Sequence, residues 1–193
     1  MAGVTFEQAE AMVSERLGKK AAAHSHRVAK QSRALAIVYG ADSDAAGLAG
    51  MLHDWDRQTP DDELLAAARK AGIAVSDVDA AQPHLLHART GAQALKGELP
   101  GLPGEIVSAV ARHTIGAADM SALDMIVYIA DMIEPGRDYP AVDDLRESVG
   151  HVELSELFAR CYEQSMLHLI VARKRIHPDS VAVWNSLVAG GAR

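Results

Sequence analysis

The sequence predicts an all-α protein of one domain with about nine helices, on three observations. The chain has 193 residues, the length of one ordinary domain with a full core. Apolar residues make up 49% of the chain and aromatic residues only 4%, so the core must consist of small and aliphatic side chains, which suit packed helices. No apolar alternation of period two is long enough to predict a strand.

Capping signals place the helices of the first half. Thr5 and Gln8 have the spacing of a capping box at the start of the first helix. Gly40 ends the second helix, because glycine readily adopts the left-handed conformation of a helix stop. Thr59 and Pro60, followed by acidic residues, mark a later start as a hydroxyl cap and a first-turn proline. The helices predicted from these signals span residues 5–17, 20–39, 43–54 and 60–71.

Prolines and one serine cap place the helices of the second half. The stretch 73–82 is either a short helical turn or a loop, and Pro83 opens the helix that follows it. Pro103 starts another helix after a loop rich in glycine and proline. Ser121 caps an apolar helix that Pro135 stops. The predicted helices span residues 83–95, 103–113, 121–135, 142–149, 152–172 and 179–189.

Charge and composition restrict the partners. A formal net charge of −7 makes a nucleic-acid duplex or an anionic membrane an unfavourable partner for the surface as a whole. An anionic small molecule can still bind where a metal supplies local positive charge. A single cysteine, Cys161, excludes an internal disulfide and a thiolate metal cluster. The N-terminal residues lack signal-peptide features, and no apolar run reaches the roughly 18 residues of a membrane span, so we expect a cytosolic protein.

His53 and Asp54 stand out because they directly follow an apolar helical run. Burying such groups without compensation costs several kcal/mol. A divalent metal compensates both, since histidine offers a neutral nitrogen and aspartate an oxygen that can bridge two ions. Asp131 also follows an apolar run and is predicted to be buried. It is either a capping or ion-paired aspartate or a metal ligand.

Three more histidines lie within or at the end of apolar helices: His24, His87 and His113. Each on its own is compatible with a structural histidine. His26 lies about 200° around the helix from His24, so the two cannot face one site. Four histidines and two aspartates, with no thiolate, suit two divalent ions such as Fe, Mn, Zn or Mg. Two ions that share a carboxylate can activate a bridging water and hold a phosphate for in-line attack.

The chain also resembles a known family. The motifs that carry the resemblance are HSHRVAKQSRALAIVYG, AGMLHD, LLHARTGA, ARHTIGAADMSALDMIVYIADMIEPGRDYPAV and RIHPDSVAVWN. In their order and all-helical setting they resemble the HD superfamily of metal-dependent phosphohydrolases. The closer similarity is to its YqeK family, whose members hydrolyse diadenosine tetraphosphate symmetrically to two ADP. The resemblance covers about Lys20 to Asn185, and the block from His113 to Arg137 is its most specific part.

The resemblance implies a single HD-type domain over residues 1–193. It would consist of an N-terminal helix at about 5–17, a metal-site core at about 20–140 and C-terminal helices at about 142–189. It also implies a dinuclear metal site, usually with iron, in which Asp54 bridges the ions and stands with His53 at the catalytic centre. The implied ligands are His24, His53, Asp54 and Asp131 of the HD core, with His87 and His113 for the second ion.

The expected reaction is attack of a metal-bridging hydroxide on an inner phosphorus of a dinucleoside polyphosphate, with ADP as the leaving group. The predicted substrate contacts are Lys20, Arg57, Thr114 and Arg137. Thr114 directly follows a predicted ligand, and Arg137 follows the helix stop after Asp131. For both arginines, a surface ion pair is the alternative to a contact with substrate.

Two positions depart from the family pattern. Family members often carry an arginine where this chain has Ala21, and a lysine shortly after the His-Asp pair, where this chain has Asp56 and Arg57. Arg57 can substitute for the lysine. A carboxylate at Asp56 is unfavourable beside a phosphate unless it points away. These departures concern substrate affinity rather than metal binding.

Three other functions are compatible with the same residues. They are an HD phosphohydrolase that acts on mononucleotides, a di-iron oxygenase, and a nucleotide-sensing module that binds dinucleotides without turnover. Alanine-rich helix faces are compatible with a homodimer and equally with core packing. One of the remaining histidines, His84, lies near His87 on a helix face and can act behind it. The histidines predicted to lie outside the site are His26, His84, His151, His168 and His177.

Overall fold

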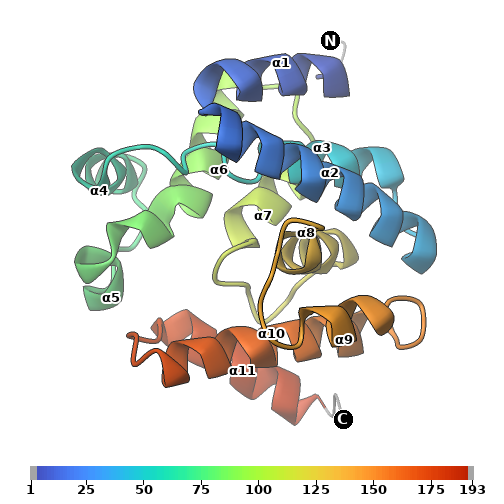
Figure 1. The fold of residues 1–193 in the computed structure, drawn as a ribbon. Coiled ribbons are helices and arrows are strands. Elements are labelled where there is room, and N and C mark those ends of the chain that lie inside the picture. Colours follow the sequence, from blue (N-terminus) through green and yellow to red (C-terminus); the bar gives the residue numbers. More distant parts are fainter. Residues whose placement is uncertain (1–3, 191–193) are drawn as a thin grey trace.

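The computed structural model describes residues 4–190, which form eleven α-helices and one short 3₁₀ helix and contain no strand (Figure 1). The all-α prediction is confirmed. Residues 1–3 and 191–193 of the predicted domain lie outside the described part. None of the described helices combines the length and hydropathy needed to cross a lipid bilayer. The elements are α1 (Phe6–Arg16), α2 (Lys19–Tyr39), α3 (Ser43–Leu52), α4 (Asp61–Lys70), α5 (Asp77–Ala81), η1 (Pro83–Leu86), α6 (His87–Glu98), α7 (Gly104–Arg112), α8 (Ala122–Ile133), α9 (Val142–Glu147), α10 (Leu154–Val171) and α11 (Pro178–Ala189).

The structure has more helices than the predicted nine, in part because of the segment between α4 and α6. The stretch 73–82, for which a helical turn and a loop were both open, contains the five-residue helix α5. Pro83 starts the 3₁₀ helix η1 rather than an α-helix, and α6 begins only at His87. A short tight helix of this kind changes the direction of the chain just before the first residue of α6.

Most capping predictions are confirmed, and one is wrong. Thr5 forms the predicted capping box, Gly40 ends α2 with a φ of 69°, and Ser121 forms a capping box at the start of α8. Thr59 does not cap α4. Its backbone N–H is hydrogen-bonded in the turn after α3, and Pro60 is the N-cap without a side-chain bond. Thr59 therefore belongs to the turn that also contains His53 and Asp54, and not to the start of α4.

Helix α8 is the central helix of the domain. It packs against α2, α3, α7, α9 and α10. In Figure 1 it lies between the N-terminal helices and the layer formed by α10 and α11. One apolar cluster fills the space among α1, α2, α3, α6 and α7, and a second surrounds α8 and α10. A polar residue on α8 can therefore lie at the junction of both clusters.

Helices α2 and α3 approach each other closely at Gly50. A Cβ at this position would lie 2.7 Å from the Oγ of Ser32 and 2.9 Å from the Cα of Ala29. Only glycine leaves room for this contact. The close packing brings the end of α3, where His53 follows, next to the helix that carries His24.

Candidate metal centre

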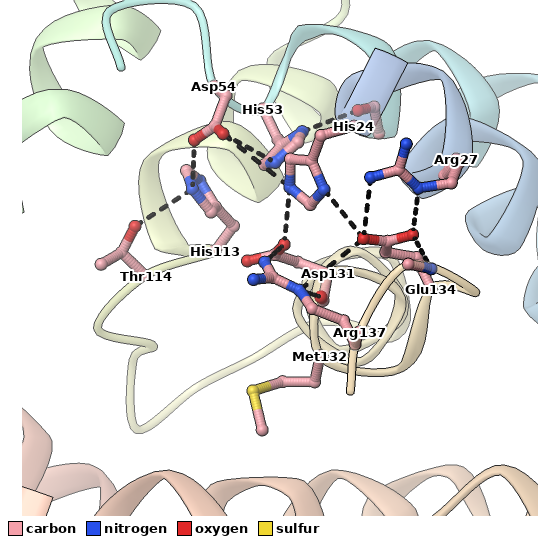
Figure 2. Close-up of polar contacts among 12 residues, drawn as sticks. His24, Arg27, His53, Asp54, His113, Thr114, Asp131, Met132, Glu134 and Arg137 are labelled. Atoms are coloured by element: carbon pink, nitrogen blue, oxygen red, sulfur yellow. Dashed lines mark hydrogen bonds and ion pairs between the residues drawn. The ribbon is translucent and has the colours of Figure 1, made fainter. Parts of the chain in front are cut away.

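Six side chains from five separate segments converge at this junction, and they are the six residues predicted as ligands. Figure 2 shows His24 and His53 between the two aspartates. The helices that carry these residues pack against one another through the two apolar clusters, and this packing fixes the backbone of each residue. His24 comes from α2, His53 and Asp54 from the turn after α3, His87 from the start of α6, His113 from the end of α7, and Asp131 from α8.

Asp54 lies between two pairs of histidines. Its Oδ2 is 3.4 Å from the Nε2 of His53 and 3.9 Å from the Nε2 of His24. Its Oδ1 is 3.1 Å from the Nε2 of His87 and 3.6 Å from the Nε2 of His113. The two oxygens of one carboxylate thus face different histidines. A carboxylate in this position can bridge two cations.

The backbone orients three of the four histidines. The Nδ1 of His53 lies 2.8 Å from the carbonyl oxygen of the residue three positions earlier. His87 and His113 repeat this contact at 2.6 Å and 2.8 Å. A carbonyl oxygen only accepts, so Nδ1 carries a proton in each ring, and Nε2 is the atom that faces the centre and can bind a metal when it carries no proton. Metal-ligating histidines are typically held in this way.

A carboxylate orients His24. Its Nδ1–H donates to the Oε1 of Glu134 at 3.1 Å, and its Nε2 lies 2.9 Å from the Oδ1 of Asp131. Glu134 is only 1% exposed. Its Oε2 accepts from the Nε of Arg27 at 2.5 Å and from the backbone N–H of Gly136 at 2.6 Å (Figure 2). A carboxylate behind a ligating histidine fixes the ring and raises its basicity.

Sequence reasoning missed both Glu134 and Arg27. Two signals were present. Arg27 lies three residues after His24 and so shares its helix face. Glu134 directly follows an apolar helix and precedes a proline, where a charged side chain is unusual. The contact itself joins residues 107 positions apart, which no local pattern reveals.

The aspartates give the centre a strong negative charge. Burial alone would raise the pKa of both carboxyl groups. The charge of His53 and hydrogen bonds from the rings hold the pKa of Asp54 below the usual range, and the hydrogen bond with His24, followed by the charges of His53 and Arg137, does the same for Asp131. Burial alone would lower the pKa of His53, yet the two carboxylates reverse this and raise it to about 9. Without a metal, His53 therefore holds a proton at neutral pH. A metal cation can replace that proton as the compensating charge.

The donor atoms fit divalent cations. The Nε2 of His53 has no hydrogen-bond partner, although the residue is fully buried. The Nε2 atoms of His87 and His113 lie 3.1 Å apart, close enough for both to bind one cation. Nitrogen and oxygen donors without a thiolate suit Fe, Mn or Zn. Two groups have ligand atoms within 4.8 Å of one another, His24–His53–Asp131 and His53–Asp54–His113.

The centre opens into a cleft of about 670 Å³. Two of the predicted substrate contacts, Lys20 and Arg57, line the cleft as exposed cations. A third, Thr114, lies beside the rings, with its Oγ1 3.0 Å from the Nε2 of His113. These three side chains can face a ligand held in the cleft.

Arg137, the fourth predicted contact, is engaged with Asp131. Its guanidinium donates to the Asp131 carboxylate, and its Nε donates to the Asp131 carbonyl at 2.7 Å. It also lines the cleft. Arg137 therefore orients a predicted ligand and adds positive charge to the cleft.

Asp56 points away from the cleft. It is buried, and its Oδ1 accepts from Arg16 at 2.8 Å. The same guanidinium donates from Nε to the carbonyl of Trp55 at 2.8 Å. The unfavourable placement of Asp56 beside a phosphate therefore does not occur. Ala21, the other departure from the family pattern, lines the cleft.

The remaining histidines lie outside the six-residue cluster. His26 contacts Glu10 on the surface, with its Nε2 3.1 Å from the Oε1 of Glu10, and His84 contributes the carbonyl that orients His87. His177 is 5% exposed and belongs to a separate buried hydrogen-bond network. The other two, His151 and His168, are exposed.

A largely apolar groove of about 870 Å³ continues from the cleft. One wall is the C-terminal half of α10, and the other includes Gln82, His84 and Leu85 at η1. Figure 2 shows the Met132 side chain pointing away from the metal residues toward α10. The residues that line both the cleft and the groove are Thr114, Tyr128, Met132, Arg137 and Ser165.

Comparison with known proteins matches residues 21–136 to the HD domain family. The symmetrical bis(5′-nucleosyl)-tetraphosphatase of Bacillus subtilis is 29% identical over 95% of this chain and 98% of its own length. The enzyme of the same description from Staphylococcus aureus is 31% identical over 75% of this chain and 74% of its own. A crystal structure of a predicted HD superfamily hydrolase involved in NAD metabolism, from Clostridium acetobutylicum, is 26% identical, with a TM-score of 0.90, and covers 98% of this chain and 100% of that one.

Proposed function

The chain belongs to the HD domain family, and from this premise we propose that it is a metal-dependent hydrolase that cleaves diadenosine tetraphosphate symmetrically into two ADP. The observation that carries the proposal is the convergence of four histidines and two aspartates beneath the cleft. The two relatives named as symmetrical bis(5′-nucleosyl)-tetraphosphatases support the choice of substrate. A homodimer and a cytosolic location stay predictions.

We assign the donors to two divalent ions according to which carboxylate oxygen of Asp54 each histidine lies near. His24, His53, Asp131 and the Oδ2 of Asp54 would hold one ion. His87, His113 and the Oδ1 of Asp54 would hold the other. We propose iron as the native metal, with Mn, Zn or Mg as alternatives, on the resemblance and the donor chemistry. When bound, two such ions supply a hydroxide at neutral pH and offset the charge of the phosphoryl group.

The residues around the centre have distinct tasks in this proposal. Lys20 and Arg57 on the cleft walls offset the negative charge of the tetraphosphate. The hydroxyl of Thr114, which lies 3.0 Å from a ring nitrogen of His113, can donate to a phosphoryl oxygen. Arg137 keeps Asp131 in place and brings a further positive charge to the cleft.

The groove accounts for the nucleoside part of the substrate. A base and a ribose are large and only partly polar, and ligand sites for such groups are mostly apolar with a few polar side chains. The groove has this character and shares Thr114 and Met132 with the cleft. A nucleoside in the groove would therefore continue directly into phosphates over the metal centre.

Product analysis with diadenosine tetraphosphate tests the proposal. The protein is reconstituted anaerobically with Fe(II), or with Mn(II), and an Asp54→Ala variant is assayed in parallel. ADP as the sole product, lost in the variant, is the expected result. Asp56→Asn is the matched control, because Asp56 lies two residues away but faces Arg16.

Other outcomes would overturn the proposal in different ways. AMP with ATP would contradict symmetric cleavage. Phosphate release from mononucleotides alone would favour a mononucleotide phosphohydrolase, and oxygen uptake without phosphate release would favour an oxygenase. Tight binding of the dinucleotide with no ADP formed would favour a sensing module.

A further inference from the structure

A buried polar network that includes the groove residue His177 lies outside the six-residue metal cluster. His177, just before α11, and Asp79, in α5, are 5% and 1% exposed. The Nε2 of His177 lies 3.1 Å from the Oδ2 of Asp79. The Oγ of Ser76 lies 2.8 Å from the same carboxylate oxygen and 3.1 Å from the ring. The proposed metal chemistry does not use this network.

The hydrogen-bond partners define the protonation of His177. Its Nδ1 accepts from the backbone N–H of Asp179 at 3.1 Å and therefore carries no proton. Nε2 then carries the proton and donates to Asp79. One neutral imidazole thus caps the start of α11 and also binds a carboxylate of α5.

The network ties together segments that are far apart in the sequence. His177 and Asp79 are 98 residues apart, and Asp79 also accepts from the guanidinium of Arg89 at 2.5 Å. Arg89 belongs to α6, two residues after the predicted ligand His87. Within the described part of the chain, α5 packs against η1, whereas neither α10 nor α11 makes an extensive packing contact with it. The two sides are therefore held together here mainly by hydrogen bonds.

The tie joins opposite walls of the groove. His177 lines the groove together with Lys174 and Arg175, all from the segment between α10 and α11. His84 and Leu85 line it from η1, which directly follows α5. Loss of the His177–Asp79 contact would free these walls to separate, while the metal residues would keep their own supports from the backbone and Glu134.

We propose that His177 is a positioning residue for substrate binding, which holds the groove walls at the separation that one nucleoside of the dinucleotide requires. The inference rests on the proposed function. It gives the C-terminal motif RIHPDSVAVWN a role that the metal chemistry leaves open.

Replacement of His177 by asparagine tests this role. Asparagine is a good N-cap, so α11 keeps its cap, but its short side chain cannot reach Asp79. We expect the KM for diadenosine tetraphosphate to rise about tenfold with kcat little changed, because uniform binding is lost. Hydrolysis of bis(p-nitrophenyl) phosphate, which does not need the groove, should stay as in the wild type. His177→Gln, whose longer amide can reach Asp79, should recover part of the affinity.

Asp124→Asn is the matched control. Asp124, like Asp79, is a buried aspartate in a capping box that pairs with an arginine. Unlike Asp79, which binds the groove residue His177, it binds Arg112 and Ser121, and neither of these lines the groove. Melting temperatures are measured for all variants. We expect Asp124→Asn to lower stability without raising the KM. An equal increase in KM for Asp124→Asn would show that the change at His177 acts through general destabilisation, and it would overturn the inference.

The assay separates failure of this inference from failure of the proposed function. If the wild type forms no ADP from diadenosine tetraphosphate, the proposed function fails. If the wild type forms ADP and His177→Asn retains the wild-type KM, only the role of His177 fails. Should His177→Asn not fold, Asp79→Asn carries the same prediction, because it weakens the hold on both His177 and Arg89.

Discussion

The metal centre and the groove are built in different ways, although they share one continuous cavity. At the centre, each histidine is fixed by a second contact, from a backbone carbonyl for three rings and from Glu134 for His24. The groove has largely apolar walls, and one of its lining residues, His177, is bound to Asp79. The centre is thus suited to chemistry that needs fixed atoms, whereas the groove is suited to affinity and selectivity. Substitutions in the two regions should therefore differ in whether kcat or KM changes.

The largest expected effect is at Asp54, the residue that both halves of the centre share. Asp54→Ala should lower kcat by at least about 10³-fold and reduce the amount of metal bound, because each oxygen faces a different pair of histidines. Steady-state kinetics and elemental analysis of the purified protein check this. Retention of both metal and activity would show that Asp54 is not the bridge.

Glu134→Gln should have the next largest effect. The amide keeps the size of the side chain but removes the charge that binds His24 and Arg27. Metal affinity or activity should fall by about 10- to 100-fold, the usual range for a partner behind a ligand. Metal titration and kcat measure the effect. Glu10→Gln is a suitable control, because Glu10 pairs with His26 at 3.1 Å on the surface and should change neither quantity.

Metal binding should depend on pH through His53. In the metal-free protein its pKa is raised to about 9, so a proton occupies the ring at neutral pH and must leave when a metal binds. Metal affinity should therefore rise by about tenfold per pH unit up to about 9. Calorimetric titration in buffers of different ionisation enthalpy would count the released protons. An affinity that does not change with pH would contradict the assigned charge balance.

The same proton also affects the stability of the metal-free protein. Because the pKa of His53 in the folded state is above its ordinary value, the stabilisation is fully present below that ordinary value and is lost as the pH rises through about 9. Unfolding of the metal-free protein in denaturant across this range should show the loss. Metal-loaded protein is the control and should not show it.

The smallest expected effect concerns the exposed cations of the cleft. Arg57→Ala and Lys20→Ala should each raise the KM by about a few-fold with kcat unchanged, because exposed charges contribute little and are screened. The difference from wild type should shrink as salt is added. Lys70→Ala on α4, which does not line the cleft, serves as the control. A large fall in kcat for Arg57→Ala would instead place this side chain at the reacting phosphate.

Local signals in the sequence were sufficient for the fold class and for singling out the candidate ligands, whereas the full set of six was implied by the family resemblance. Capping at Thr5 and Ser121 and the stop at Gly40 depend on residues close together in the chain, so their positions were predictable. His53, Asp54 and Asp131 were conspicuous because polar groups directly follow apolar runs. The short helix α5 and the 3₁₀ turn at Pro83 were not assigned, because segments of four or five residues carry too few local signals.

Only the tertiary structure decided which residues contact and orient the side chains of the site and of the groove. Glu134 meets Arg27 across 107 residues, and His177 meets Asp79 across 98. Such contacts depend on how α8 packs against α2 and on how α5 lies beside the start of α11, and neither is encoded in any local spacing. The direction of Asp56, away from the cleft and toward Arg16, is of the same kind. The sequence by itself therefore determined which residues are available for chemistry, and the packing of the helices decided how they are oriented and which of them act together.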